Sequence, residues 1–563
     1  MAGNLNENLK DFNLWYRYSA SDGLTAGPGS AISLSEDGLI CAISGAGLFL
    51  KQGASWANLN LLQTEPVGSM VNTSRLVITT GTSIYFYQDK MVSLINTSLS
   101  ANPVDGLFDN GITWVGDLGN GLISIDATSE ISLLPNGPAN NELTKLRGLS
   151  TRLTALSPAH NAAFNPLKND AGVSVFENEQ WVVYSSSAKE STISIPEFLD
   201  VTDAYISDDG SQAIFSSFGY GLLTIEDGIS TIIDENSPGS PLENTMPPER
   251  NVYISSLSTN YQGVNMLNYE ADVPLHRLTN DGQWQSFMPG FTNAKYGSHL
   301  LSTPWDDHWI VLNPSFGGGL VLFNESGSSK YLSTQQGNGG LPSSTIHEII
   351  LDKENKMWVA TDRGVVYYPF PESLIDEPII DPVLPIYEQN ILFSNQKVTA
   401  LAVDGGNRIW MATDQGAWLF EDDGQTLVAN FNIDNSPLLS NSIHDIAIVD
   451  ATGEVFFATD KGLISFRGTS TAGIEAAEMK IYPNPVYPGY SGLITMERVP
   501  ENAVVTITDV SGRLVYKTTS EGNTAVWDGR DAYGQTVPTG VYFVFITNED
   551  KSRKQAGKIV FIN

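Results

Sequence analysis

The sequence has one cysteine, Cys41, among its 563 residues. A single cysteine excludes an internal disulfide framework and a cysteine metal cluster. Cys41 lies in an expected apolar strand, residues 39–43, where a free cysteine is commonly buried. The scarcity of cysteine fits either the cytosol or a large exported β protein whose core needs no disulfides.

Basic residues and long apolar runs are also scarce. The chain has 30 Lys and Arg against 63 Asp and Glu, a formal net charge of −33. This acidic excess argues against binding nucleic acid or an anionic membrane through general electrostatics. No stretch approaches the ~18 apolar residues of a membrane helix, and residues 1–7 lack the basic start and apolar core of a signal peptide. We therefore expect either a cytosolic protein or a sequence that begins after a removed segment.

A repeated unit dominates residues 346–466. Trp-Val-Ala-Thr-Asp-Arg-Gly ends at Gly364, Trp-Met-Ala-Thr-Asp-Gln-Gly at Gly416 and Phe-Phe-Ala-Thr-Asp-Lys-Gly at Gly462. Each copy reads as a short apolar strand, a turn and a returning strand, and a period of about 40 to 50 residues is typical of propeller blades. We predict that the Thr-Asp-x-Gly turn is a structural hydrogen-bond network. We also predict that Leu341 and Leu438 fill the seams between blades.

Weaker copies extend the pattern back to Trp15, giving about ten blades up to Phe466. Because propeller rings usually close with about 4 to 8 blades, ten blades indicate two rings. We place about seven blades in residues 12–327 and about three in residues 328–468, and one of the two rings need not be complete. Residues 469–478 read as a small polar linker.

Residues 479–563 read as a separate module of short alternating strands with glycine turns. A module of about 85 residues of this kind predicts an antiparallel, immunoglobulin-like β-sandwich. The predicted fold class is therefore all-β: propeller blades in two rings, followed by a C-terminal sandwich. The content of 41% hydrophobic and 10% aromatic residues is ample for these cores.

Candidate catalytic and metal-binding residues are few. His347 and His444 occupy the same position in the repeat, so we assign them to blade architecture. His299 and His308 flank Trp305-Asp306-Asp307 and are the candidates for a metal site with a carboxylate. The sequence contains no hydrolase, zinc-peptidase or phosphate-binding motif, and we expect no enzymatic activity and no cofactor.

Acidic pairs and exposed aromatic residues leave two alternatives open. Asp208-Asp209 and Asp422-Asp423 lie beside glycines in turns, where bonds from side chain to backbone explain them. Carboxylate-rich turns also hold calcium, so a calcium site in one of them is the alternative. Tyr296, Trp305 and Trp309 fit core packing, or a platform on which a glycan stacks.

Particular motifs carry a resemblance to known families. The repeated blade unit resembles the two-component-regulator type propeller repeat of periplasmic sensor domains of Bacteroidota. The C-terminal module resembles the type A C-terminal sorting domain of the type IX secretion system. Five ordered motifs support this second resemblance: Lys480-Ile-Tyr-Pro-Asn-Pro-Val486 and residues 505–515, 526–531, 539–542 and 558–560.

Propeller repeats followed by this ending are similar to the PorZ family of surface components of that system. The resemblance implies an exported protein, associated with the outer-membrane surface, that keeps its sorting domain. It also implies an attachment complex with a sortase, a shuttle protein and a β-barrel-associated partner, and binding of anionic lipopolysaccharide for delivery to the sortase. The sorting or docking motif then falls on Gly512, Gly529, Gly540, Val541, Tyr542 and Lys558.

The family has two propellers with fourteen blades in all, so about ten blades here imply that the leading blades are absent. The last three blades then belong to a ring whose other members precede them. An anionic glycan would need a local basic or aromatic patch, and the densest basic group is Lys551, Arg553, Lys554 and Lys558. The alternatives are a secreted cargo enzyme or glycan-binding protein carrying a sorting domain, and a sensor ectodomain.

Overall fold

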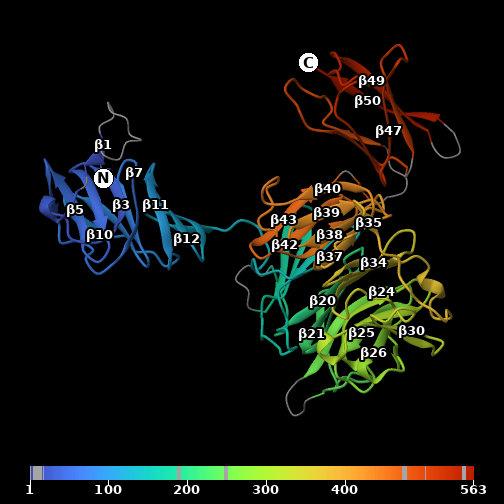
Figure 1. Ribbon diagram of the computed structural model, residues 1–563. Coiled ribbons are helices and arrows are strands. Elements are labelled where there is room, and N and C mark those ends of the chain that lie inside the picture. The colour runs from blue at the N-terminus through green and yellow to red at the C-terminus, as the bar shows by residue number, and fades with distance from the viewer. Residues whose placement is uncertain are drawn as a thin grey trace. The chain divides into compact units, whose positions relative to one another are not determined.

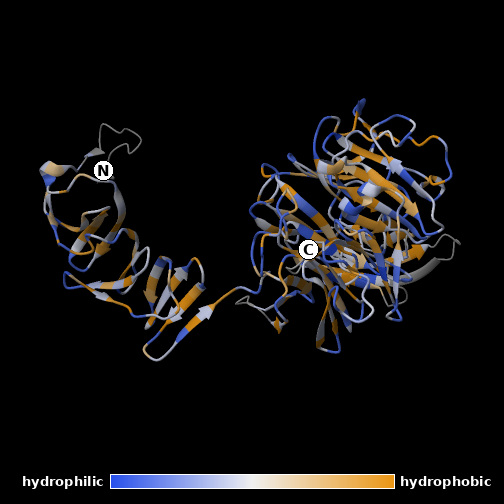
Figure 2. Cartoon of the chain, turned by 90° about the horizontal axis from the view of Figure 1, so that it is seen from below, coloured by the Kyte–Doolittle hydropathy of each residue, from blue (hydrophilic) through white to orange (hydrophobic). Residues whose placement is uncertain are grey.

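The computed structural model describes residues 2–3, 15–16, 18–186, 192–245, 251–468, 470–471, 479–500, 503–547 and 553–562. The chain forms two compact units, residues 1–136 and 137–563, and each is described by itself. Strands make up most of both units (Figure 1), and hydrophobic residues concentrate in the strands while the connecting loops are mostly hydrophilic (Figure 2). No helix in the described part of the chain is long and apolar enough to span a membrane.

The first unit, blue in Figure 1, is a stack of three blades over residues 29–133, all of which are described. Each blade is a four-stranded antiparallel meander. The strands are β3 (Gly29–Ser35), β4 (Gly38–Ile43), β5 (Gly47–Gln52) and β6 (Ser55–Asn58); β7 (Val67–Asn72), β8 (Leu76–Thr80), β9 (Ile84–Gln88) and β10 (Met91–Leu94); β11 (Pro103–Asp109), β12 (Ile112–Asp117), β13 (Gly121–Ile125) and β14 (Glu130–Leu133). A short pair, β1 (Ala2–Gly3) and β2 (Trp15–Tyr16), and a 3-10 turn, η2 (Ala20–Asp22), precede them. Cys41 is half-buried in β4.

Apolar contacts between neighbouring blades hold this stack together. Ile40 of β4 and Ile78 of β8 are buried together between the first and second blades. On the outer faces of the stack, Ile32 and Leu34 of β3 and Leu122 of β13 remain exposed. A propeller blade is apolar on both faces and needs a neighbour on each. Residues Tyr18 and Leu24 pack on the outer face of the first blade and bury Phe49 and Trp56, so the described residues cover that face only in part.

In the second unit, residues 145–467 form seven blades, described except for residues 187–191 and 246–250. The strands of the first four blades are β15 (Lys145–Gly148), β16 (Arg152–Leu156), β17 (Val173–Glu177), β18 (Gln180–Ser185) and β19 (Ile193–Ser194); β20 (Val201–Ile206), β21 (Gln212–Gly219), β22 (Gly221–Glu226) and β23 (Ile229–Ile233); β24 (Val252–Asn260), β25 (Gly263–Asn268), β26 (Leu275–Thr279) and β27 (Trp284–Phe287); β28 (Gly297–Ser302), β29 (Asp307–Leu312), β30 (Leu320–Asn324) and β31 (Ser329–Leu332).

The strands of the last three blades are β32 (Ile346–Leu351), β33 (Met357–Thr361) and β34 (Gly364–Tyr368); β37 (Val398–Val403), β38 (Ile409–Thr413), β39 (Gly416–Phe420) and β40 (Leu427–Phe431); β41 (Ile443–Val449), β42 (Glu454–Thr459) and β43 (Gly462–Arg467). Between the blades lie the short pair β35 (Ile386–Tyr387) and β36 (Asn390–Ile391) and the 3-10 turns η3 (Thr292–Tyr296), η4 (Pro314–Phe316) and η5 (Pro371–Ser373).

The seven blades close into a ring because β41 of the last blade packs beside β15 of the first. Leu146 and Leu153 of the first blade are buried against Ala447 and Phe456 of the last. The backbone N–H of Leu146 also donates to the Asp445 carboxylate at 2.7 Å. Apolar burial and this side-chain hydrogen bond therefore close the ring, and neither blade borrows a strand from the other.

The repeated Thr-Asp-x-Gly segment is the hydrogen-bonded turn that the sequence predicts. The Thr361 hydroxyl donates to the Gly364 carbonyl at 2.8 Å, and it accepts from the Arg363 N–H at 3.1 Å. The turns at Thr413 and Thr459 repeat both bonds. The threonine, rather than the aspartate, therefore makes this network.

Both predicted seam residues are confirmed. Leu341 is buried with Trp309 of the fourth blade and Val359 of the fifth. Leu438 is buried with residues of the sixth and seventh blades, among them Trp410.

The C-terminal residues 480–561 form two antiparallel sheets around one core, described except for 501–502 and 548–552. One sheet has β44 (Lys480–Tyr482), β45 (Ile494–Glu497) and β48 (Thr524–Trp527). The other has β47 (Leu514–Thr519), β46 (Val504–Thr508), β49 (Gly540–Thr547) and β50 (Arg553–Phe561). Trp527 and Met496 of the first sheet are buried against Ile507 and Val544 of the second. The predicted sandwich is present.

The predicted number of ten blades agrees with the described strands, three in the first unit and seven in the second. The predicted grouping is wrong. The boundary lies between residues 136 and 137, not at residue 327, and Trp309 and Val359 share a core across the predicted boundary. The last three blades belong to a ring whose other members precede them. Of the predicted linker, 469–478, only residues 470–471 lie within the described part.

Candidate functional site

Six of the seven inner strands of the ring, all but β15, share a local irregularity that directs side chains into the central channel. The pairing of β20, β24, β28, β32, β37 and β41 with the next strand shifts register by one residue near the start of each strand. Such β-bulges re-aim side chains. The residues that follow the shift are Asp203, Ser256, His299, Glu348, Ala400 and Asp445.

Side chains at and after the bulges connect neighbouring inner strands. The hydroxyls of Thr202 and Ser255 each donate at 2.6 Å to a carbonyl of the next blade, Ile254 and Gly297 respectively. In the opposite sense, the Leu257 N–H donates to the Asp203 carboxylate at 3.0 Å. Neighbouring inner strands need these bonds because each pairs by its backbone mainly within its own blade.

Asp203 is the most strongly held charge in the channel. Its side chain has no solvent exposure and accepts from Lys145 at 2.9 Å and from Arg147 at 2.8 Å. Burial alone would raise the pKa of Asp203, but the charges of Arg147 and Lys145 outweigh it and hold the pKa well below its ordinary value. The buried carboxylate is therefore ionised and fully paired.

Glu348 and Asp445 lie in the same channel, but unlike Asp203 their carboxyl groups have raised pKa values. Burial raises the pKa of both carboxyl groups, and the charge of Asp445 raises the pKa of Glu348 further. His299 Nε2 lies 3.1 Å from the Glu348 carboxyl. Burial lowers the pKa of His299 to about 3, so its imidazole is neutral. Neither carboxyl group pairs with a lysine or arginine among the described residues.

These raised pKa values predict that the ring loses stability as pH rises. In the unfolded chain both carboxyls ionise near the ordinary pKa of about 4, whereas in the folded ring they hold their protons to higher pH. Folding therefore binds protons between these two values, and thermal unfolding of the full chain should occur at lower temperature at pH 8 than at pH 5. Asp445→Asn should weaken this dependence, because asparagine does not ionise. An unchanged pH profile would contradict the assigned states.

The channel opens at one end into a cavity of about 570 Å³, within the usual range for a ligand site. We call it the mouth cavity. Four of the chain's six histidines, all of which are described, line it: His160, His299, His347 and His444. Lys145, Glu348 and Asp445 line it as well, together with threonine and serine hydroxyls. The cavity thus combines imidazoles, carboxyls and an ammonium group.

One long connection builds up one side of the mouth. Residues 157–172, the mouth loop, join β16 to β17, whereas two-residue turns serve the same place in the last three blades. The Asn161 side chain accepts from the Ala163 and Asn165 N–H groups, and the buried Asp200 carboxylate accepts from Lys168 and Asn169. The loop is therefore well fixed, and ordered connections of this length are usually functional.

Aromatic rings from this loop and the adjoining blades pack against one another. We call this set the aromatic wall: His160, Phe164, Phe218, Tyr269, Tyr296 and Phe316. Phe164 stacks on His160 at 4.1 Å and on Tyr269 at 4.9 Å, although its φ of 58° is unfavourable for a bulky residue. Strain of this kind persists where the surroundings impose it, often beside a functional site.

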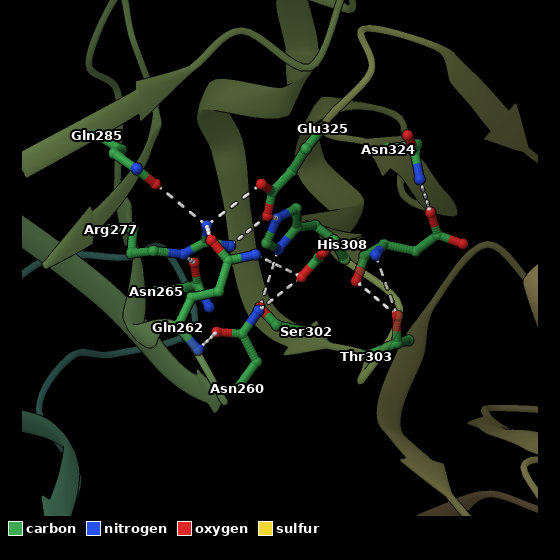
Figure 3. Close-up of polar contacts among 12 residues, drawn as sticks. Asn260, Gln262, Asn265, Arg277, Gln285, Ser302, Thr303, His308, Asn324 and Glu325 are labelled. Atoms are coloured by element: carbon green, nitrogen blue, oxygen red, sulfur yellow. Dashed lines mark hydrogen bonds and ion pairs between the residues drawn. The ribbon is translucent and has the colours of Figure 1, made fainter. Parts of the chain in front are cut away.

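The structure separates His299 and His308, the two candidate metal ligands of the sequence. His299 lies in the channel, whereas His308 is buried between the third and fourth blades, where its Nδ1 lies 2.9 Å from the Ser302 hydroxyl and its Nε2 3.0 Å from Glu325 (Figure 3). Within the described residues, no group of three or more His, Cys, Asp or Glu is placed to hold a metal ion. The short sequence spacing does not bring these two side chains together, because His299 faces the channel and His308 faces the core between two blades.

Glu325 instead joins His308 to a buried arginine. Arg277 has no solvent exposure, pairs with Glu325, and donates to Asn265 at 2.9 Å and to Gln262 at 2.7 Å (Figure 3). Burial raises the pKa of Glu325, but the hydrogen bonds from His308 and Arg277 outweigh it and bring the pKa to about 2. This network satisfies buried charges between two blades, which is a structural role.

The remaining sequence candidates occupy mostly structural positions. The Asp209 carboxylate accepts from the hydroxyl of Ser207 and from Ser211, and Asp422 pairs with Lys356 at 2.6 Å. Trp309 is fully buried, and Trp305 is half-buried and donates to Asp307.

His347 and His444 do share a repeat position, at the bulges of β32 and β41. His347 lies 2.6 Å from Asp362, the aspartate of the repeated turn. That both histidines also line the mouth cavity was missed. The signal was present in the matching Ile346-His-Glu-Ile and Ile443-His-Asp-Ile segments.

The predicted sorting residues are largely those that shape the sandwich. Tyr542 is buried and donates to the Pro538 carbonyl at 2.6 Å. Gly540 and Val541 begin β49, and Gly512 adopts a φ of +83° in the turn before β47. Lys558 is exposed on β50. The carbonyl of Lys558 and the N–H of Val560 both bond to the Asn484 side chain at 2.9 Å, which attaches the Tyr-Pro-Asn-Pro segment to β50.

Gly529 offers a test of this packing. Its φ is +74°, and a Cβ added to it would lie 2.8 Å from the Phe561 ring. Gly534 has nearly the same φ, +77°, with no heavy atom within 4 Å of an added Cβ. Gly529→Ala should therefore destabilise the sandwich by about 1–3 kcal/mol more than Gly534→Ala, because only the first adds a clash. Hydrogen exchange at the amides of β46 and β49 in increasing denaturant would measure the difference, and equal losses would exclude the clash.

Comparisons with known proteins bear on the C-terminal module and on the fold. Residues 491–562 match the model of the CHU_C type IX secretion signal domain. No curated protein sequence matches the chain. Among solved structures, the chain is similar to PorZ, an essential bacterial surface component of the type-IX secretion system of human oral-microbiomic Porphyromonas gingivalis. The identity is 22%, the match covers 100% of this chain and 78% of that chain, and the TM-score is 0.69.

Two more distant structures are extracellular domains of hybrid two component systems from B. thetaiotaomicron. The first has 11% identity, covers 97% of this chain and 75% of that chain, and has a TM-score of 0.41. The second has 14% identity, covers 98% and 80%, and has a TM-score of 0.36. The chain thus carries a type IX secretion signal domain at its C-terminal end, and it shares the fold of PorZ over its whole length.

Proposed function

We propose that the chain is an exported, non-enzymatic surface component of the type IX secretion system, associated with the outer membrane. The observation that carries this proposal is the joining of a type IX secretion signal domain to propeller units that share the fold of PorZ. In this role the protein binds anionic lipopolysaccharide and delivers it to the sortase within an attachment complex. The signal domain stays on the mature protein.

The charge of the chain sets a condition on lipopolysaccharide binding. With a formal net charge of −33, the protein repels an anionic glycan except where basic or aromatic groups gather locally. Of the predicted basic group, Lys558 is exposed on β50, while Lys551 and the side chains of Arg553 and Lys554 lie outside the described part. Phe316 and Tyr296 stack at 3.6 Å at the outer end of the aromatic wall and offer a glycan an aromatic surface.

The alternative is a secreted cargo enzyme or glycan-binding protein that only bears the sorting domain. One observation bears on it: Glu348 and Asp445 both line an open cavity, and glycosidases use two carboxyl groups, although one of theirs is ionised while the pKa values of both groups here are raised. Mass spectrometry of the protein released from the cell surface separates the two functions. A component keeps residues 491–562, whereas a cargo protein has lost them.

Calorimetry of the purified chain with lipopolysaccharide from its own source tests the ligand. We expect saturable binding that is lost when the distal polysaccharide is deleted, because the proposed delivery concerns that part of the molecule. Lipopolysaccharide that is truncated within the core, and so lacks the distal part as well, serves as the second comparison. Absence of binding to every form would remove the glycan role and leave a role in protein assembly.

A further inference from the structure

The carboxyl groups of the channel outnumber its cations. Asp203, Glu348 and Asp445 face Lys145 and Arg147, and both cations pair with Asp203 alone. Glu348 has only the neutral His299 as a side-chain partner, and Asp445 accepts only from the Leu146 and Ile446 N–H groups in the described structure. Glu348 and Asp445 thus lie in the channel without a cationic partner among the described residues, and they hold protons there instead.

The mouth cavity gives an incoming cation a path to these two carboxyls. Glu348 and Asp445 both line it, and so do apolar groups, among them Pro158, Phe164 and Ile346. A long basic side chain buries an alkyl stem against such groups while its charged end reaches a polar partner. The cavity thus provides both an apolar wall for a stem and a carboxyl pair for its end.

We propose that the mouth cavity receives a lysine or arginine side chain from a protein partner, with the cationic group lying between Glu348 and Asp445. The mouth loop and the aromatic wall favour a polypeptide over a small free amine, because they extend the contact surface beyond the cavity. Phe316 is 42% exposed at the end of that wall, and exposed aromatic residues are enriched at the cores of protein interfaces.

The charge of the whole chain acts in the same direction. A net charge of −33 attracts a basic segment and speeds its encounter with the mouth. The same field repels an anionic glycan. The test of this site uses basic peptides and no glycan, so its outcome does not depend on the function proposed above.

Protons take part in this binding. The titratable and charged groups that face the site are Lys145 and Arg147 of β15, Asp203 of β20, His299 of β28, Glu348 and His347 of β32, Asp445 and His444 of β41, and His160 of the mouth loop. A bound cation favours the ionised carboxylates, so it releases the protons that Glu348 and Asp445 hold in the empty site. Affinity should rise as pH increases from 5 to 8.

Titration calorimetry of the full chain tests the proposal. The probe is an acetylated, amidated Gly-Lys-Gly peptide, with the arginine peptide as a second probe and the norleucine peptide as an uncharged control. We expect the lysine or arginine peptide to bind at least tenfold more tightly than the norleucine peptide, with proton release. Glu348→Gln and Asp445→Asn keep the side-chain shape and should each weaken binding at least tenfold.

Asp227→Asn is the matched control, since it removes one negative charge at the far end of β22 and should leave binding unchanged. Thermal unfolding of each variant confirms that it is folded. Equal affinity for the lysine and norleucine peptides, or unaltered binding by folded Glu348→Gln and Asp445→Asn, would overturn the proposal. Binding of spermidine without binding of either basic peptide would overturn the assignment to a protein partner.

Discussion

Replacing Gly148 with alanine is expected to open the seven-bladed ring at the seam between its first and last blades. A Cβ added to Gly148, the last residue of β15, would lie 1.9 Å from the Ile448 carbonyl oxygen of β41, and it would lie within 3 Å of the Ile448 backbone carbon and nitrogen as well. No side-chain rotation relieves a clash with backbone atoms, so β15 and β41 must separate. We expect a loss of at least about 3 kcal/mol in the free energy of unfolding.

Hydrogen exchange measures this effect where it arises. The backbone amides of β15 and β41 should lose protection in Gly148→Ala, whereas those of the first unit and of the sandwich should keep it. Gly68→Ala is the control. Gly68 is also an inner-strand glycine, but its added Cβ would have no neighbour closer than 3.7 Å. If both variants retained normal protection, close packing at Gly148 would not hold the ring closed.

Replacing Asp203 with asparagine is expected to have an effect of similar size for an electrostatic reason. The carboxylate is the shared partner of Lys145 and Arg147, and its side chain is fully buried. Asparagine keeps the shape but leaves two cations in the channel without their partner. Removing one member of a buried ion pair costs about 3–5 kcal/mol.

The pH dependence of this loss has a defined sign. The pKa of Asp203 is lowered in the folded state, so its contribution is fully present above the ordinary aspartate pKa of about 4 and is lost as pH falls below it. Urea denaturation at pH 7 and at pH 3 should show a large difference between Asp203→Asn and the unaltered chain at pH 7, and a smaller one at pH 3.

Asp445→Asn is the matched control for Asp203→Asn. Asp445 follows the bulge of β41 as Asp203 follows the bulge of β20, yet the pKa of Asp445 is raised rather than lowered. At pH 8 the same substitution should therefore destabilise the ring much less at Asp445 than at Asp203, because only at Asp203 does it leave cations without their carboxylate. Destabilisation of equal size at both positions would show that the channel does not distinguish them by charge.

Much of the fold could be predicted from local sequence. The apolar strands, the Thr-Asp-x-Gly turns and the seam residue Leu341 depend on contacts within a blade or between consecutive blades, so their signals lie close together in the chain. The count of ten blades agrees for the same reason. The grouping failed because a repeat shows where blades are, but not which two end blades meet.

The candidate site shows the same limit. Leu146 and Asp445 are bonded although they lie 299 residues apart, and nothing local to either segment shows that they are neighbours. His299 and His308 lie nine positions apart, yet they belong to different cores. Proximity in the sequence therefore does not bring these two candidate ligands together, and the carboxyls of the channel were not recognised as a site.

The sequence by itself determined the blades, the sandwich and the acidic character of the protein, because strand periodicity, turn residues and composition are local properties. The C-terminal motifs likewise sufficed to identify the secretion signal domain that residues 491–562 match. Only the tertiary structure decided which blades form the closed ring and what its channel contains. Ring closure brings inner strands from the whole length of residues 145–449 around one axis. The cations placed beside a buried carboxyl there decide whether it stays ionised, as Asp203 does beside Lys145 and Arg147, or keeps a proton, as Glu348 does.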